Sequence, residues 1–83
     1  MLVDAIDHNS GIPPYRQLTA ILRRQIERGE LARRLPSERA LAQAHGVSVG
    51  TVRKALALLR EAGLVETYRS YGSRAVPPEE RNG

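Results

Sequence analysis

The side chains that could do chemistry gather in one short basic segment, residues 48–54. If this segment begins a helix, Ser48 and Thr51 lie beside free backbone N–H groups, where a phosphate oxygen binds favourably. The planar fork of Arg53 matches the O6 and N7 atoms of guanine, so Arg53 is the first candidate for a base contact. Lys54, a point charge on a flexible stem, suits a phosphate. These side chains together predict binding to double-stranded DNA.

The flanking sequence predicts the two helices that would position this segment. Ser37 can cap a helix over residues 38–45, which ends where Gly46 can turn the chain in a left-handed conformation. Ser48 can cap the next helix, and Gly63 closes it. A helix-turn-helix also needs a small residue in its first helix and apolar residues that hold its second helix. The residues at the linked positions of this motif are Ala42, Gly46, Val47 and Val52.

Three further elements would complete one small domain. Pro13 and Pro14 open a helix that Gly29 ends, and its apolar residues recur at helical spacing. These apolar residues are Tyr15, Leu18, Ile21, Leu22 and Ile26. Residues 64–76 predict a β-hairpin, and residues 1–6 suit a short edge strand. The predicted fold class is α+β, mainly α: a winged helix-turn-helix with three helices and a C-terminal β-hairpin wing.

The expected recognition helix has a core face and an open face. Its core positions are Val52, Ala55, Leu56, Leu59 and Ala62, and the opposite face presents Gly50, Lys54, Ala57 and Glu61. Val49 lies between the two faces, so it can contact a thymine methyl group or cap the edge of the core. Glu38 can orient Arg53 or only favour the positive end of its own helix.

The predicted hairpin supplies further DNA-binding candidates. Arg69 and Arg74 can touch the DNA backbone or the minor groove, and Gly72 permits close approach. Tyr68 and Tyr71 suit either contacts with sugar and phosphate or packing within the small sheet.

Charge and length favour one DNA-binding domain. The 83 residues carry a net charge of +4. Residues 33–74 hold seven arginines and one lysine against three glutamates, so the positive charge is concentrated there and favours a polyanionic partner. We assign residues 1–77 to the winged helix and residues 78–83 to a disordered tail or the start of a linker.

Several other classes of function lack support in the sequence. The chain has no cysteine, and His8 and His45 lack companions at metal-ligand spacing, so we expect no metal and no cofactor. No apolar run approaches the roughly 18 residues of a membrane span, and no signal-peptide pattern is present, so we expect a cytoplasmic protein without membrane contact. No nucleophile stands with a base and an orienting group, so we expect no enzyme.

Three stretches carry a resemblance to a known family. They are LPSERALA at residues 35–42, GVSVGTVRKAL at residues 46–56 and LREAGLV at residues 59–65. With them, roughly residues 12–77 resemble the winged-helix DNA-binding domain of the GntR family of bacterial transcription regulators. The resemblance implies homodimers on inverted-repeat operators, and in some members a first strand that pairs with the wing. It implies DNA contacts at Ser37, Arg39, Thr51, Arg53 and Gly72.

The sequence departs from the family pattern at three places. The loop GELARRLPSE is two residues shorter than usual and carries Arg33 and Arg34 where the family has Pro-Gly. The family commonly has arginine at the position of Val49, so the preferred DNA sequence should differ. Such regulators normally carry a C-terminal effector domain, and this chain ends at Gly83 without one. We therefore expect an excised domain or a short regulator.

The leading hypothesis is a sequence-specific transcription regulator, a repressor that occludes a promoter. A second hypothesis is a winged helix used as a protein-interaction module, with the basic face incidental. A third is an architectural DNA binder with little sequence preference. Selective retention of DNA fragments separates the first hypothesis from the other two.

Overall fold

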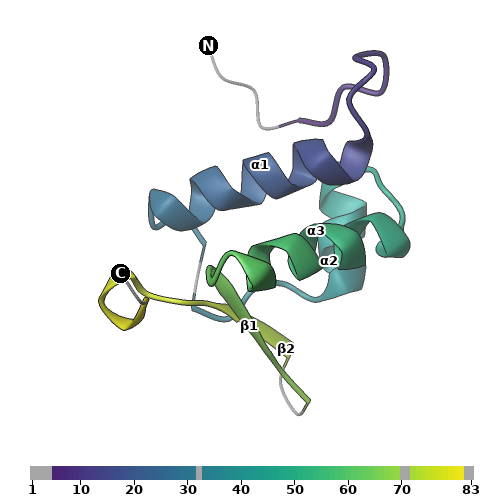
Figure 1. Cartoon of the computed structure of the whole chain (residues 1–83). Helices are drawn as coiled ribbons and strands as arrows, with labels where there is room; N and C mark the ends of the chain where they lie inside the picture. Colours follow the sequence, from purple (N-terminus) through teal and green to yellow (C-terminus); the bar gives the residue numbers. More distant parts are fainter. Residues whose placement is uncertain (1–4, 32, 70–71, 82–83) are drawn as a thin grey trace.

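The computed structural model describes residues 5–31, 33–69 and 72–81. Three helices come first, namely α1 (Pro14–Glu27), α2 (Glu38–His45) and α3 (Val49–Glu61). A two-stranded antiparallel hairpin follows, with strands β1 (Val65–Tyr68) and β2 (Gly72–Ala75), and then one short 3-10 helix, η1 (Pro78–Glu80). Figure 1 shows the helices packed together and the hairpin projecting below them. The predicted winged helix-turn-helix is confirmed.

Short polar residues set the ends of the helix-turn-helix. The Ser37 hydroxyl accepts a 3.0 Å hydrogen bond from the Ala40 N–H at the start of α2. The Ser48 hydroxyl accepts one of 3.1 Å from the Thr51 N–H at the start of α3. Between the two helices, Gly46 has φ 66° and ψ 38°, a left-handed conformation that costs glycine little. Both predicted caps and the predicted turn are therefore confirmed.

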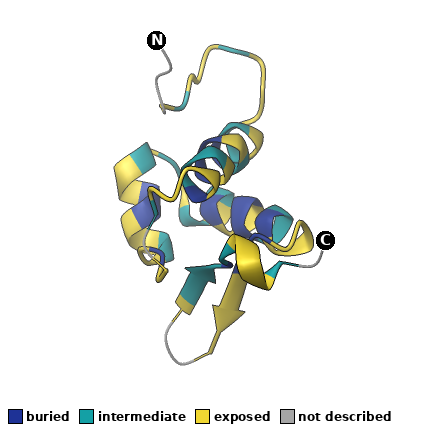
Figure 2. Cartoon of the chain, turned by 90° about the vertical axis from the view of Figure 1, so that its left-hand side faces the viewer, coloured by how far each residue is buried: buried dark blue, intermediate teal, exposed yellow. Residues whose placement is uncertain are grey.

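The hydrophobic core lies where α1, α2 and α3 face one another and where the hairpin begins. Its buried members are Leu18, Leu22, Ile26, Leu35, Leu41, Ala42, Val52, Ala55, Leu56, Leu59, Leu64 and Val65. Figure 2 shows the buried residues of the helices turned toward the interior. The predicted apolar stripe on α1 is buried except for Tyr15, which is half-buried. Ala62 was predicted in the core and is exposed instead, because it is the C-cap residue at which α3 ends.

Residues 33–35, between α1 and α2, pair with β2 at the edge of the wing. The Leu35 N–H donates to the Ser73 carbonyl at 2.8 Å, and the Ala75 N–H donates to the Arg33 carbonyl at the same distance. Arg34 and Arg74 form an antiparallel bridge between these two bonds. The predicted N-terminal strand is not found at residues 5–6, and its residues 1–4 lie outside the described part of the chain. At this edge the wing pairs with the short loop that carries the two arginines.

The Gln17 side chain hydrogen-bonds the chain ahead of α1, and Ile6 of the same segment packs against the core. The Gln17 Oε1 accepts a hydrogen bond of 2.8 Å from the Asp7 N–H. Its Nε2 lies 2.8 Å from the carbonyls of Asp7 and Ile12 and 3.0 Å from the Ser10 hydroxyl. Gln17 thus fixes residues 7–12 as a compact turn on the first turn of α1.

The C-terminal residues fold back on the wing. The Glu80 carboxylate lies 2.7 Å from Arg74 Nη2 and 3.3 Å from Arg33 Nη2. The Arg81 Nε donates to the Val76 carbonyl at 3.0 Å. The sequence suggested nothing for this segment to pack against, and the structure supplies two arginines from elsewhere in the chain. The domain boundary at residue 77 stays a prediction.

Candidate nucleic-acid interface

The start of α3 presents the polar residues that the sequence singled out. The Ser48 hydroxyl donates to Thr51 Oγ1 at 3.0 Å while it caps the helix. The first turn of α3 contains no acidic residue, so no carboxylate offsets the positive end of its dipole. Gly50 is exposed between the two hydroxyls, and the nearest side-chain atom to the place of its missing Cβ is Ser48 Oγ at 3.7 Å. This turn can receive a phosphate oxygen or the edge of a base.

Glu38 of α2 holds Arg53 of α3 in place. The Arg53 Nε donates to Glu38 Oε1 at 3.0 Å, and the Arg53 side chain is 68% exposed. Because this bond uses Nε, the two Nη groups at the end of the guanidinium stay available for a bidentate contact with guanine. Of the two roles considered for Glu38, the structure shows the contact that orients Arg53. Glu38 also lies in the first turn of α2, so the dipole role is satisfied too.

Val49 and Lys54 both turn out to have neighbours within the domain. Val49 is half-buried and packs against the core, which favours the core-edge interpretation over a thymine contact. The Lys54 Nζ lies 4.5 Å from the centroid of the Tyr15 ring on α1, a cation–π distance. Lys54 remains exposed above that ring. Sequence reasoning missed this contact because it placed Tyr15 in the core.

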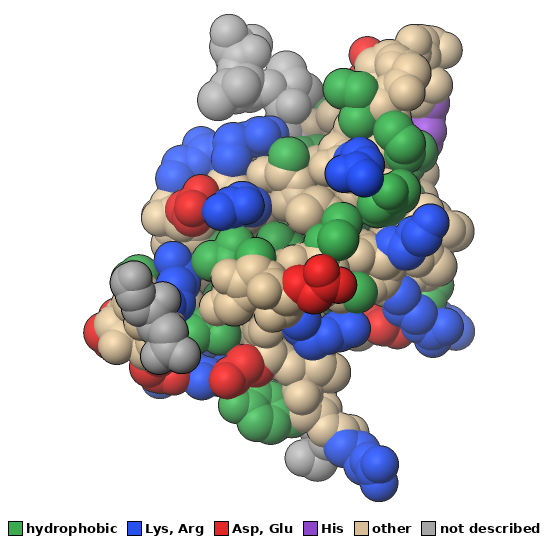
Figure 3. Space-filling view, viewed as in Figure 1, with side chains coloured by type: hydrophobic (Ala, Val, Ile, Leu, Met, Phe, Trp, Pro, Cys, Tyr) green, Lys and Arg blue, Asp and Glu red, His purple; other side chains and the backbone are tan. Residues whose placement is uncertain are grey.

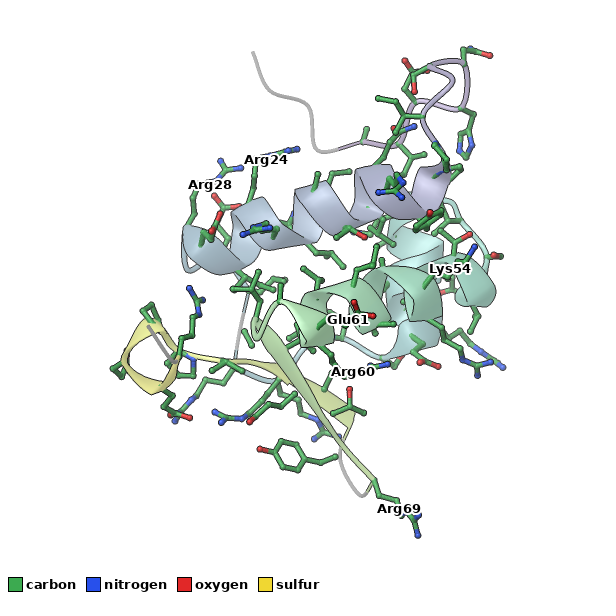
Figure 4. The ribbon with its side chains drawn as sticks, viewed as in Figure 1. Arg24, Arg28, Lys54, Arg60, Glu61 and Arg69 are labelled. Carbon is green, nitrogen blue, oxygen red and sulfur yellow. The ribbon has the colours of Figure 1, made fainter. Side chains whose placement is uncertain are left out.

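A groove separates the start of α2 from the wing. It has a volume of about 380 Å³, and its walls include Ser37, Glu38, Arg69 and Gly72. Arg39 is exposed near the start of α2, and Arg69 points away from the body of the protein at the far end of β1 (Figure 4). The candidates from α2 and from the wing therefore border the same hollow surface.

The backbone conformation at position 72 favours glycine, although there is room for a side chain within the domain. The φ of Gly72 is +93°, a region that other residues rarely adopt, and a Cβ added there would meet no atom within 4 Å. Close approach to a ligand outside the chain stays a prediction. Tyr71, the neighbouring candidate, lies outside the described residues.

Arg74 lies apart from the other candidates. In the register of the hairpin it pairs with Glu66, on the face opposite Thr67 and Ser73. Its Nη2 lies 2.6 Å from Glu66 and 2.7 Å from Glu80, and its side chain is only 17% exposed. This enclosure argues against the predicted contact with DNA.

Glu66, Tyr68, Arg74 and Glu80 form a cluster on the wing, the wing cluster, and their contacts shift three pKa values. The hydrogen bond from the Tyr68 hydroxyl, 2.7 Å long, and then the bond from Arg74 lower the pKa of Glu66. Donation to Glu66 raises the pKa of Tyr68. Glu80, followed by Tyr68 and Glu66, raises the pKa of Arg74. The Tyr68 hydroxyl therefore bonds within the wing while its side chain stays exposed, and its two predicted roles stay predictions.

The cations of the described residues differ in whether a carboxylate lies beside them. Arginines that lie within 4 Å of a carboxylate include Arg23, Arg28, Arg33, Arg53 and Arg74. Within residues 5–31, 33–69 and 72–81, Arg16, Arg39, Lys54 and Arg69 have no carboxylate partner. Figure 3 shows Lys and Arg side chains along the right-hand edge of the molecule down to the tip of the wing. The positive charge that is not neutralised internally is therefore spread over α1, α2, α3 and the wing tip.

The described residues hold neither a metal-ligand cluster nor a membrane-spanning helix. No three of their His, Cys, Asp and Glu side chains come together to hold a metal ion. None of the helices in these residues has the length and hydrophobicity to cross a membrane.

The three helices, the hairpin and the polar start of α3 define a winged helix-turn-helix domain. The family model described as "Bacterial regulatory proteins, gntR family" matches residues 14–74. The chain belongs to this family.

Relatives and solved structures agree with this assignment. The chain is 40% identical over 76 residues to the HTH-type transcriptional repressor NagR of Bacillus subtilis, covering 89% of this chain and 31% of NagR. Its fold is similar to YtrA of Sulfolobus acidocaldarius, a GntR-family transcription factor, with a TM-score of 0.78 and 31% identity over 92% of this chain and 82% of YtrA. It is also similar to the AraR DNA-binding domain solved in complex with operator ORX1, with a TM-score of 0.75 and 27% identity over 90% and 93% of the two chains. The chain spans about three tenths of the length of the curated relatives it matches.

Proposed function

We propose that this chain is the DNA-binding module of a transcription regulator and that it reads one operator half-site with α3. The regulator is a repressor and not an enzyme, as its similarity to relatives named repressors suggests. Because the partner is bacterial DNA, the module works in the cytoplasm. A single winged helix binds weakly, so two copies on an inverted repeat would supply the affinity.

The observation that carries this proposal is the Glu38–Arg53 pair. Arg53 is an exposed arginine on the second helix of the helix-turn-helix, and its 3.0 Å bond through Nε leaves both Nη groups for the bidentate guanine contact that we propose. Other candidate phosphate-binding residues lie nearby: Ser48 caps α3, Thr51 lies in its first turn, and Arg39 lies near the start of α2. The exposed guanidinium thus stands among donors suited to positioning it on a duplex.

The proposal is tested by selecting duplexes from a random pool with the whole 83-residue chain, together with sedimentation of the free protein. We expect enrichment of one half-site, recovered as an inverted repeat. Retention of all duplexes with steep salt dependence and no enriched sequence would indicate an architectural binder. Absence of retention at low salt would leave the protein-interaction module.

A further inference from the structure

The start of α1 carries a pair of cations around one aromatic ring. The Arg16 Cζ lies 5.4 Å from the centroid of the Tyr15 ring, and the Lys54 Nζ, from α3, lies 4.5 Å from the same centroid. Tyr15 is half-buried, whereas Arg16 and Lys54 are exposed. The ring therefore joins a cation of α1 to a cation of the expected recognition helix.

This cluster adjoins the proposed DNA-reading surface. Lys54 follows Gly50 by one helical turn, so both lie on the exposed face of α3. Figure 1 shows α1 and α3 running side by side with both starts on the right, and Figure 4 shows Lys54 on α3 close to the start of α1. Arg69 lies at the far end of the wing in the same view. The proposed surface is therefore bordered by the wing on one side and by the start of α1 on the other.

The charges of Arg16 and Lys54 are available to an external anion. Within the described residues neither has a carboxylate partner, whereas Arg23, farther along α1, pairs with Glu27 at 3.7 Å. The carboxylate of Asp7, on the turn before α1, already accepts from the Asn9 N–H at 2.9 Å. The Tyr15 ring limits the conformations of both long side chains, so less freedom is lost when they bind.

We propose that Arg16 and Lys54, held by Tyr15, form a phosphate-binding site for the DNA backbone at the edge of the half-site opposite the wing. This inference rests on the proposed function and adds α1 to the interface. The contact carries no base preference, since it is made to phosphate alone. It fixes how far the module extends along the duplex.

The test compares Arg16→Ala and Lys54→Ala with Arg23→Ala, a matched control that removes an exposed arginine from the same helix. Affinity for the selected half-site is measured over a range of salt concentrations. Each lost phosphate contact should reduce the steepness of the plot of log K against log salt by about 0.9. Between 50 and 200 mM salt, the affinity of such a variant should therefore fall about 3.5-fold less than that of the wild type. We expect this change for the first two variants, a wild-type slope for the control, and the same preferred sequence in all three.

A second measurement uses duplexes in which single phosphates flanking the half-site are replaced by neutral methylphosphonates. One such replacement should weaken binding of the wild-type protein to the duplex and leave binding of the Arg16→Ala variant unchanged. A wild-type slope for Arg16→Ala, together with a base preference that Arg53→Ala abolishes, would overturn this inference and leave the proposed function standing. A wild-type protein that retains no duplex at low salt would overturn both.

Discussion

Arg53 in α3 and Arg74 in β2 were predicted from the sequence to contact DNA, and the structure gives them different surroundings. Arg53 has one carboxylate at its Nε and a side chain that is 68% exposed. Arg74 has two carboxylates at its Nη2 and a side chain that is 17% exposed. The first guanidinium is oriented by its partner, and the second is enclosed by its partners. An ion pair therefore favours recognition only when it leaves the end of the fork open.

The difference follows from the two elements that carry these arginines. On α3 the exposed face is continuous over successive turns, so a partner on α2 can touch the stem of Arg53 from one side. On a strand, alternate residues point to opposite faces, and Arg74 falls on the face with Glu66 and Tyr68. The returning 3-10 helix then brings Glu80 to the same face.

The largest expected effect separates the two arginines directly. Arg53→Ala should cost about 1 to 3 kcal/mol of binding free energy at one base position and relax the preference there. Arg74→Ala should leave the affinity and the preferred base unchanged, because its guanidinium is held within the domain. Fluorescence anisotropy with the selected half-site and its single-base variants measures both. A base preference lost in Arg74→Ala would reverse the comparison.

The next effect concerns the hydroxyls that shape the two regions. Ser48→Ala removes the cap of α3 and should reduce the free energy of unfolding by about 1 kcal/mol. Ser73→Ala removes a hydroxyl contact of 2.9 Å with Thr67 on the wing and should cost less, because both hydroxyls are solvated. Urea denaturation gives both values. Equal losses would show that the wing depends on local polar contacts as much as α3 does.

A smaller effect of opposite sign is expected at Gly50. A Cβ there would meet only Ser48 Oγ at 3.7 Å, so Gly50→Ala should raise the free energy of unfolding by about 0.5 to 1 kcal/mol. The added methyl group also lies on the proposed DNA-facing turn, so affinity for the half-site should fall. Thermal unfolding and anisotropy report the two quantities separately. Unchanged affinity would mean that this turn stays away from the duplex.

The smallest effect is the contribution of the wing cluster to acid stability. The pKa of Glu66 is lowered in the folded protein, so its stabilising effect is present above the ordinary glutamate pKa of 4.5 and is lost as the pH falls through the folded value. Glu66→Gln should therefore flatten the loss of stability in acid. Urea midpoints measured at neutral pH and below pH 4.5 test this, with Glu79→Gln as the control. If the urea midpoints of wild type and Glu66→Gln fall equally with pH, Glu66 does not contribute to the loss of stability in acid.

The sequence predicted the helix-turn-helix well because its signals are local. Ser37, Gly46 and Ser48 each act on backbone groups within a few residues, so cap, turn and helix could be placed without knowledge of the tertiary fold. The contact between Glu38 and Arg53 was foreseen as one alternative because the two helices had already been placed.

The missed features depend on residues far apart in the chain. Glu80 and Arg33 meet across 47 positions, and Lys54 meets Tyr15 only when α1 packs against α3. No periodicity or spacing reports such contacts. The pairing of residues 33–35 with the edge of the wing was also unpredictable, since three residues are too few to show a strand pattern. Candidate side chains could thus be named from sequence, but their partners required the structure.

The Gln17 amide couples the contacts that attach residues 7–12 to α1. Four contacts to three residues depend on one planar group, so they form together and are lost together. Residues 7–12 are thus attached to α1 through one amide, next to Ile6, which packs against the core. The sequence of this turn can vary where only backbone carbonyls and N–H groups meet that amide, at Asp7 and Ile12, whereas position 10 has to keep its hydroxyl.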